Sequence, residues 1–237
     1  QHYVSDTIFY ECSFTKVLEM FYVDLSQYAV FALLPSYLER KNSSLVYMVE
    51  RIRMKANRQM GGFFLHELES LQKQLTEAHN AGLKIMLFGV TFALLEMAEK
   101  FPVAIPGAII FETGGMKGRS KELTRMELHE KLCSSFGVAK IHSEYGMTEL
   151  LSQAWSKGDG IFRCPPWMRV LIADINDPLS YLDNGRTGGI NIIDLANFHS
   201  CSFLSTQDLG RVFDDGSFEV LGRFDNSDIR GCSLLAP

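Results

Sequence analysis

The sequence predicts an α/β fold, in which a mostly parallel sheet flanked by helices is followed by a small β-rich subdomain. Short apolar runs such as Lys84 to Val90 alternate with longer segments of helical periodicity, which is typical of βαβ units. After Leu151 this periodicity stops, and short alternating stretches lead to a hairpin signal at Asp214-Asp215-Gly216. We therefore expect an α/β subdomain over residues 1–155 and a β-rich or barrel-like subdomain over residues 156–237.

The expected elements follow from apolar runs, capping residues and glycines. Continuous apolar runs predict buried parallel strands at residues 28–34, 84–90, 106–111 and 139–143. Helical periods after capping residues predict helices from Ser5 or Asp6 to about Phe21, from Ser43-Ser44 to about Ala56, and over 64–79, 91–100 (capped by Thr91) and 120–133. Gly61-Gly62 is expected to be a break. In the second part, strands are expected at residues 168–174, 189–195, 210–213 and 217–221.

Composition excludes several classes of protein. The hydrophobic fraction of 46% and the charged fraction of 22% are typical of a globular protein, and no apolar run approaches the roughly 18 residues that span a bilayer. A net charge of −5, with scattered Lys and Arg, gives no basic surface for nucleic acid. The five cysteines are odd in number and form no C-x-x-C pair, which indicates a reduced, cytoplasmic protein.

The segment Ile141 to Leu150, I-H-S-E-Y-G-M-T-E-L, combines several groups that can bind a nucleotide. It is predicted to leave a strand and enter a loop, which is where open α/β sheets hold ligands. Tyr145 offers an aromatic face, and a glycine follows it that lets a ligand approach the backbone. Thr148 offers a hydroxyl for a phosphate, and Glu149 offers a carboxylate for Mg²⁺. The alternative is that Thr148 and Glu149 only cap a helix.

Three further segments are expected to be loops after strands, at residues 112–118, 205–211 and 221–232. Each segment alone is weak evidence for a binding site, because most glycine-rich turns have no ligand and Asp208 would by default cap a turn. Their order and content together resemble the adenylate-forming enzymes, the superfamily of acyl-CoA synthetases and firefly luciferase, which join a carboxylate to AMP. The resemblance covers nearly the whole chain and implies ATP and Mg²⁺ as cofactors.

The resemblance assigns roles to individual residues. Y-G-M-T-E resembles the Y-G-x-T-E motif, which implies that Tyr145, with Gly146, lies on adenine, that Thr148 meets the phosphate and that Glu149 holds Mg²⁺. T-Q-D-L-G-R resembles T-G-D-L-G-R, which implies that Asp208 binds both ribose hydroxyls, although Gln207 replaces the usual glycine.

Two more segments extend the resemblance. G-R-F-D-N-S-D-I-R-G resembles a hinge motif, which implies that Arg223 lies near the ribose and phosphate and that Asp225 acts at the hinge. The lysine of that motif is absent, and the spacing is shorter. Thr113-Gly114-Gly115 resembles the turn whose backbone lies along the adenine and the acyl pocket. Phe31 and Phe111 are expected near that pocket.

Within the superfamily, the chain most resembles the acyl-protein synthetase (LuxE-type) branch, the fatty-acid-activating subunit of a luminescence fatty-acid reductase. The similar segments are residues 33–45, residues 111–119 and R-G-C near the end. This implies that Cys232, beside Arg230, carries the acyl group and passes it to a partner protein, because a thiolate is a good nucleophile toward an acyl-adenylate. The alternative for Cys232 is a buried, inert thiol. The other four cysteines are expected to be structural.

Two other functions stay open. The superfamily's Ser/Thr/Gly-rich phosphate loop is expected ahead of Gln1, and nothing in the chain replaces it. One alternative is an acid–CoA ligase of the phenylacetate type, which would release a free thioester. The other is a nucleotide-binding or scaffolding subunit of an acyl reductase that performs no chemistry itself.

Overall fold

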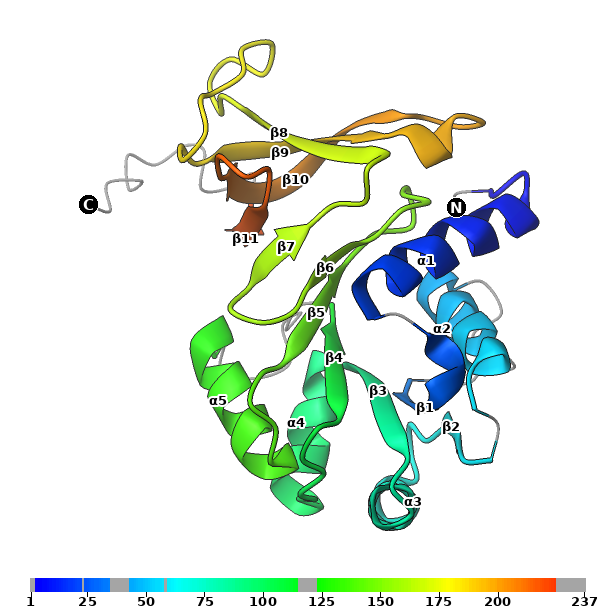
Figure 1. The fold of residues 1–237 in the computed structure, drawn as a ribbon. Helices are drawn as coiled ribbons and strands as arrows, with labels where there is room; N and C mark the ends of the chain where they lie inside the picture. The colour runs from blue at the N-terminus through cyan, green and yellow to red at the C-terminus, as the bar shows by residue number, and fades with distance from the viewer. Residues whose placement is uncertain (1–2, 23, 35–42, 58, 115–122, 225–237) are drawn as a thin grey trace. The chain divides into compact units, whose positions relative to one another are not determined.

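The computed structural model describes residues 3–22, 24–34, 43–57, 59–114 and 123–224. They belong to two compact units, which meet in the sequence between Gly160 and Ile161. The first unit is an α/β structure with a sheet whose core is parallel, and the second is built of antiparallel strands (Figure 1). The predicted α/β fold with a β-rich second part is therefore confirmed.

The sheet of the first unit has a parallel core and one antiparallel strand. Its order is β2 (Gly61–Phe63), β1 (Tyr28–Leu33), β3 (Lys84–Val90), β4 (Ile109–Thr113), β5 (His142–Tyr145) and β6 (Ala154–Ser156). Neighbours from β2 to β5 pair in parallel, and β6 pairs antiparallel to β5. The carboxyl ends of β4 and β5 consequently lie at one edge of the sheet.

Among the described residues of the first unit, five helices cover the two faces of this sheet. They are α1 (Thr7–Tyr22), α2 (Ser44–Lys55), α3 (Leu68–Asn80), α4 (Thr91–Lys100) and α5 (Arg125–Phe136), and a short 3₁₀ turn spans Leu25–Gln27. α4 and α5 lie on one face, and α1 and α2 lie on the other (Figure 1). Local caps fix where helices begin: Ser43 caps α2, and Thr124 forms a capping box with Glu127 at α5. None of the described helices is long and apolar enough to cross a membrane.

Alternate residues of the central strands face opposite layers of helices. Ile85 and Leu87 of β3 belong to a core that includes buried residues of α3, α4 and α5. On the other face, Phe88 stacks on Phe111 of β4 at a centroid distance of 4.4 Å, and Trp155 and Phe111 form a T-shaped pair with centroids 5.2 Å apart. Burial on both faces explains why these strands read as continuous apolar runs.

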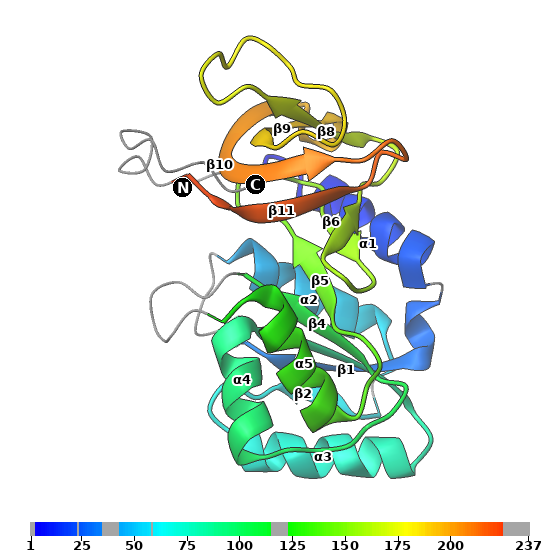
Figure 2. The same cartoon turned by 90° about the vertical axis from the view of Figure 1, so that its left-hand side faces the viewer.

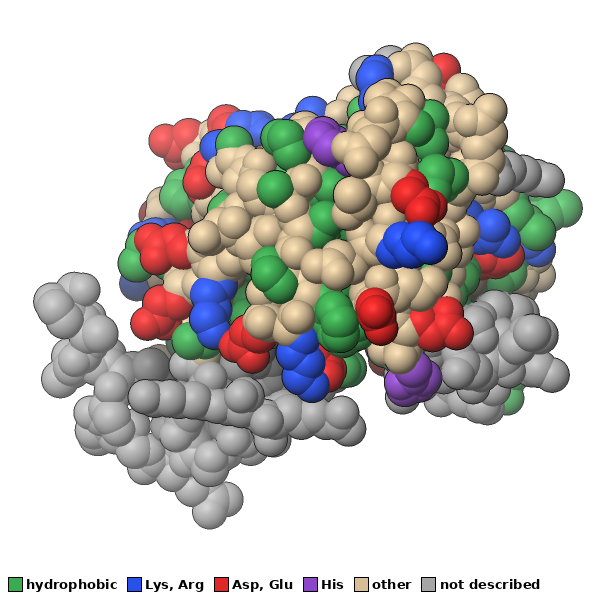
Figure 3. Space-filling view, turned by 90° about the horizontal axis from the view of Figure 1, so that it is seen from below, with side chains coloured by type: hydrophobic (Ala, Val, Ile, Leu, Met, Phe, Trp, Pro, Cys, Tyr) green, Lys and Arg blue, Asp and Glu red, His purple; other side chains and the backbone are tan. Residues whose placement is uncertain are grey.

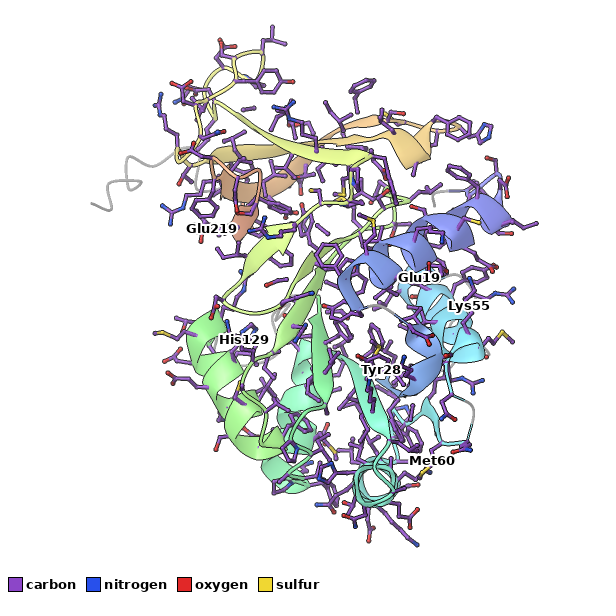
Figure 4. All side chains as sticks on the ribbon, in the orientation of Figure 1. Glu19, Tyr28, Lys55, Met60, His129 and Glu219 are labelled. Carbon is purple, nitrogen blue, oxygen red and sulfur yellow. The ribbon has the colours of Figure 1, made fainter. Side chains whose placement is uncertain are left out.

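The aromatic layer continues into α1. Tyr22, at the end of α1, forms a T-shaped pair with Phe111, with ring centroids 5.1 Å apart. Lys55, labelled in Figure 4, donates a hydrogen bond of 2.8 Å from α2 to the hydroxyl of Thr15 in α1. These contacts attach α1 and α2 to the face of the sheet opposite α4 and α5.

Several predicted boundaries were wrong. Gly61-Gly62 begins a short strand rather than a break; Gly61 has φ +119°, and a Cβ there would lie 2.3 Å from the carbonyl oxygen of Val30. The strands expected at 106–111 and 139–143 begin and end later, at 109–113 and 142–145, because pairing with their neighbours continues into the polar residues. Thr91 is the first residue of α4 rather than its cap.

The second unit is an antiparallel sheet in the order β7 (Ile161–Arg163), β11 (Phe218–Arg223), β10 (Phe203–Val212), β9 (Gly188–Asp194) and β8 (Met168–Ala173). Figure 2 shows β10 and β11 as adjacent arrows, joined by the turn at the predicted hairpin signal. Phe162 stacks on Phe218 with centroids 5.5 Å apart. The hairpin prediction is confirmed, but β10 is much longer than the expected 210–213.

Surface charges are interspersed. On the face displayed in Figure 3, basic and acidic side chains alternate over short distances. Ion pairs between exposed side chains include Lys100–Glu96 and Lys131–Glu99, both at 2.7 Å. Such pairs contribute little to stability, roughly 0–1 kcal/mol each, so the fold depends on its buried apolar layers.

We expect Phe111→Ala to lower the free energy of unfolding of the first unit by about 3–5 kcal/mol, because it leaves a cavity among Phe88, Trp155 and Tyr22. Urea unfolding followed by circular dichroism measures the change. Phe92→Ala, at a position 45% exposed on α4, is the matched control and should cost less than about 1 kcal/mol. Equal losses in the two variants would contradict the packing described.

Candidate functional site

The carboxyl ends of β4 and β5 bring two of the predicted motifs together. Thr113, the last residue of β4, pairs with Glu144 of β5. Gly114 and Tyr145 are the next residues along these two parallel strands, so the Thr-Gly turn and the Tyr-Gly segment lie side by side. Parallel strands pair about 4.8 Å apart, which is close enough for both segments to contact one small ligand.

The turn after β4 requires a glycine and is held by a threonine from another element. Gly114 has φ +76°, a left-handed conformation that side chains other than glycine rarely adopt. Its carbonyl oxygen accepts a hydrogen bond of 2.7 Å from the hydroxyl of Thr91, at the start of α4. Thr113 is buried, with 1% of its surface exposed.

Thr148 and Glu149 lie in an exposed turn after β5. The backbone N–H of Leu150 donates to the carbonyl of Met147 at 3.1 Å, and no helix begins there. The alternative in which these residues cap a helix is therefore wrong. An exposed glutamate is a suitable oxygen ligand for Mg²⁺, which is usually held by one or two carboxylates together with substrate phosphates and water. Among the described residues, no group of three His, Cys, Asp or Glu side chains could hold a metal ion.

Glu144 is a half-buried acid beneath the Tyr-Gly segment. A Cβ at Gly146 would lie 2.2 Å from its Oε1, so the glycine makes room for this carboxyl. Burial, and to a smaller extent the nearby charge of Glu112, raises the pKa of Glu144 to about 7. Near neutral pH, the carboxyl beneath this segment is thus divided between its protonated and ionised forms.

Glu112 is a second acid at the same edge, and its side chain is buried. It precedes the turn on β4, and the hydroxyl of Thr91 lies in close hydrogen-bond contact with its Oε1. Burial raises the pKa of Glu112, while the contact with Thr91 and the charge of Arg125 oppose that effect.

His142 is neutral and anchored to α1. Its Nδ1 lies 2.9 Å from the hydroxyl of Tyr22. Burial lowers the pKa of His142 to about 4, and Lys157 and Lys140 add to that effect. His129, labelled on α5 in Figure 4, has its pKa lowered for the same main reason. The two imidazoles contribute no positive charge near neutral pH.

The second unit brings Asp208 and Arg223 together. These residues face each other across β10 and β11, and Nε of Arg223 lies 3.3 Å from Oδ1 of Asp208. Gln207 accepts a further hydrogen bond of 3.3 Å from the same guanidinium. The Thr206 hydroxyl accepts from the backbone N–H of Asp208 at 3.0 Å. Asp208 is mostly buried, whereas the side chain of Arg223 is 60% exposed.

The expected loop at residues 205–211 is instead the middle of strand β10. The strand has an irregular register between Leu209 and Gly210. A Cβ at Gly210 would lie 2.3 Å from the carbonyl oxygen of Glu219 on β11, so only glycine fits there. Gln207 therefore occupies a strand position, where the absence of the usual glycine causes no backbone strain.

Some predicted residues lie outside the described residues, namely Gly115, Asp225, Arg230 and Cys232. Phe31 and Phe111 are fully buried and pack in the two cores, so the structure gives them a core role rather than a place on a pocket wall. Burial raises the pKa of the Cys133 thiol, and burial with the charge of Asp194 raises that of Cys164 to about 12. Cys12 and Cys201 are exposed, which does not fit the structural role expected for them.

Sequence reasoning missed the acids Glu112 and Glu144 and the neutral His142. A signal for them exists in the two-residue period of strands. In H-S-E-Y, His142 and Glu144 share one face of β5, and in I-F-E, Glu112 shares a face with the apolar Ile110. An acidic residue on the otherwise apolar face of a strand is thus the sequence pattern that predicts a buried carboxyl.

Comparison with known proteins supports the fold. No protein-family model matches the sequence, and no curated protein matches it. Among solved structures, ATP-bound MatB from Rhodopseudomonas palustris is 16% identical, with a TM-score of 0.62 over 88% of this chain and 43% of that one. MenE from Bacillus subtilis, the O-succinylbenzoate coenzyme A synthetase in complex with ATP and magnesium, is 17% identical, with a TM-score of 0.61 over 88% and 44%. Coronafacic acid ligase from Pectobacterium brasiliense is 16% identical, with a TM-score of 0.56 over 84% and 39%.

The chain spans less than half the length of these solved structures. Over that length it shares the fold of these solved structures.

We expect the stability of the first unit to fall as pH rises through about 7, because ionising the half-buried Glu144 opposes folding. Its raised pKa contributes stability that is fully present below the ordinary value of 4.5 and is lost above about 7. Glu144→Gln should remove this dependence. Relative to the variant, the wild type should lose up to about 3 kcal/mol between pH 4.5 and pH 8.5.

Urea unfolding at several pH values measures the difference. Glu130→Gln removes an exposed acid from α5 and is the matched control. A constant difference between wild type and Glu144→Gln across this pH range would contradict the assignment.

Proposed function

We propose that the protein uses ATP and Mg²⁺ to convert a carboxylic acid into an acyl-adenylate. The observation that carries this proposal is the position of Y-G-M-T-E and the Thr-Gly turn at one edge of a parallel sheet, in a fold shared with ATP-bound proteins. Ligands of open α/β sheets bind at the carboxyl ends of the strands.

The proposal assigns a role to each group. The ring of Tyr145, half-buried at the end of β5, stacks on adenine, and the backbone of Gly146 and of Thr113-Gly114-Gly115 lies beside it. Thr148 donates to the α-phosphate. In the second unit, the resemblance gives Asp208 the two ribose hydroxyls and Arg223 the ribose and phosphate, and Nε of Arg223 lies 3.3 Å from Oδ1 of Asp208.

The first step is an in-line displacement. An oxygen of the substrate carboxylate attacks the α-phosphorus, the bond from that phosphorus to the bridging oxygen breaks, and pyrophosphate leaves. Glu149 would hold the Mg²⁺, which neutralises negative charge on the phosphates. The exposed turn at Thr148 and Glu149 leaves both side chains accessible to a nucleotide from solvent.

For the second step we propose transfer of the acyl group to Cys232. Its thiolate attacks the acyl carbonyl carbon, AMP leaves, and a partner protein then receives the acyl group from the resulting thioester. Support comes from the sequence segments similar to acyl-protein synthetases, which also suggest a fatty acid as substrate. The raised pKa values of the Cys133 and Cys164 thiols make these two poor nucleophiles in comparison.

A second candidate is transfer to coenzyme A. It is favoured by the structural similarity to MenE, a coenzyme A synthetase. In that case the product would be a free thioester, and Cys232 would have no part in it.

We expect the full-length protein to catalyse exchange between labelled pyrophosphate and ATP when a suitable carboxylic acid is present. Glu149→Gln should lower this exchange at least about a hundredfold, because it removes a carboxylate from the metal site. Glu130→Gln, on the exposed face of α5, should exchange like the wild type. The absence of exchange with every member of a broad panel of carboxylic acids, including fatty acids of different lengths, would contradict the proposed activity.

We expect Cys232→Ser to retain pyrophosphate exchange and to lose covalent acylation by a labelled fatty acid, because only the second step needs the thiol. Intact-protein mass spectrometry measures the acyl adduct. Cys201→Ser, which removes an exposed cysteine of the second unit, is the matched control and should acylate like the wild type. Unchanged acylation in Cys232→Ser would remove its carrier role, and turnover that requires coenzyme A would favour the second candidate.

A further inference from the structure

Three groups from separate parts of the first unit meet at the turn after β4. They are the carboxyl of Glu112 on β4, the hydroxyl of Thr91 at the start of α4, and the carbonyl of Gly114 in the turn itself. The Thr91 Oγ1 lies in close hydrogen-bond contact with Oε1 of Glu112 and 2.7 Å from the carbonyl oxygen of Gly114. The site is enclosed, because Thr91 is 2% exposed and Glu112 is 9% exposed.

Counting protons decides how these contacts are made. A threonine hydroxyl has one proton to donate, whereas the carbonyl of Gly114 and an ionised Glu112 would both require one. The Gly114 carbonyl cannot donate. Both contacts can be hydrogen bonds only if the carboxyl of Glu112 carries a proton and donates it to Thr91, which then donates its own proton to Gly114.

The charges around Glu112 are compatible with a protonated acid. Glu144 on the neighbouring strand β5 is a second acid with a raised pKa, and the two carboxyls interact through their charges. Arg125, at the start of α5, acts in the opposite sense but is itself exposed to solvent. Burial is the largest influence, and it raises the pKa of Glu112.

We propose that Glu112 is a positioning residue: its protonated carboxyl donates to Thr91, Thr91 donates to the carbonyl of Gly114, and this relay holds the Thr113-Gly114 turn in its left-handed conformation. The relay joins β4, α4 and the turn. The hydrogen bonds of the relay are independent of the proposed function. Only the idea that the turn is held ready for a nucleotide or acyl group rests on that function.

The relay gives the turn a defined pH dependence. Below the pKa of Glu112 both hydrogen bonds are intact. When the acid ionises, Thr91 turns its proton to the carboxylate, and the carbonyl of Gly114 loses its donor. The turn therefore loosens as pH rises, and it loosens without any ligand present.

Hydrogen exchange of the unliganded protein, measured by mass spectrometry on peptides covering residues 109–114, tests the relay. In wild type, the protection factor should fall about tenfold as pH rises through the pKa of Glu112, because one hydrogen bond is lost. Glu112→Gln donates through its amide at every pH, so it should keep the protection and lose the pH dependence. Thr91→Val should lose the protection at all pH values, and Thr91→Ser should restore it.

The same measurements in a Glu144→Gln background distinguish the effects of the two acids on protection. Any pH dependence of protection that remains in that background is due to Glu112. The protonation itself is read by NMR of protein labelled with ¹³C at the glutamate carboxyls, with the Glu112 signal assigned by its absence in Glu112→Gln. We expect that signal to titrate above the ordinary glutamate value of 4.5. Titration at or below the ordinary value of 4.5, or equal loss of protection in Glu112→Gln and Thr91→Val, would overturn the proposal. Because no nucleotide or acid is used, neither result depends on the proposed enzymatic function.

Discussion

The parallel pairing of β4 with β5 is the constraint on which the candidate site of the first unit depends. It sets Thr113 opposite Glu144, and from that register the positions of Gly114, Tyr145 and Gly146 follow. The register is specified by burial on both faces of the sheet. A slip of one residue would exchange Phe111, in the aromatic layer, with Ile110, in the opposite core. The packing of the hydrophobic layers thus determines which polar groups meet at the edge.

Much of the fold follows from local signals in the sequence. The apolar run from Lys84 to Val90 forms β3 with the predicted bounds, and Ser43 caps α2 as expected. The errors have a common physical origin. β4, β5 and β10 continue through Thr113, Tyr145 and Asp208 because hydrogen bonds to neighbouring strands extend them, and a local pattern does not show where that pairing stops. The polarity of these residues suggested loops, but strand pairing makes them part of the sheet.

The candidate site was predictable to different degrees in its different parts. The adjacency of the Thr-Gly turn and Y-G-M-T-E follows from placing both after consecutive parallel strands. The pairing of Asp208 with Arg223 needs the register of β10 on β11, including its irregularity at Gly210, which no local pattern specifies. Glu112 and Glu144 were not predicted for another reason. Glutamate is usually exposed, so burial at positions 112 and 144 is not expected, and the local sign of it is weak: Glu112 shares a face of β4 with the apolar Ile110.

Gly210 is required by the packing of two strands and not by a bound ligand. Its hydrogen atom faces the main chain of Glu219, so the pressure to keep it comes from the ladder between two strands rather than from any bound molecule. A descendant that had lost its substrate would still need this glycine to fold. In comparisons among distant homologues, retention of this glycine therefore says nothing about catalysis, and a change at Asp208, two residues before it, is the more informative observation.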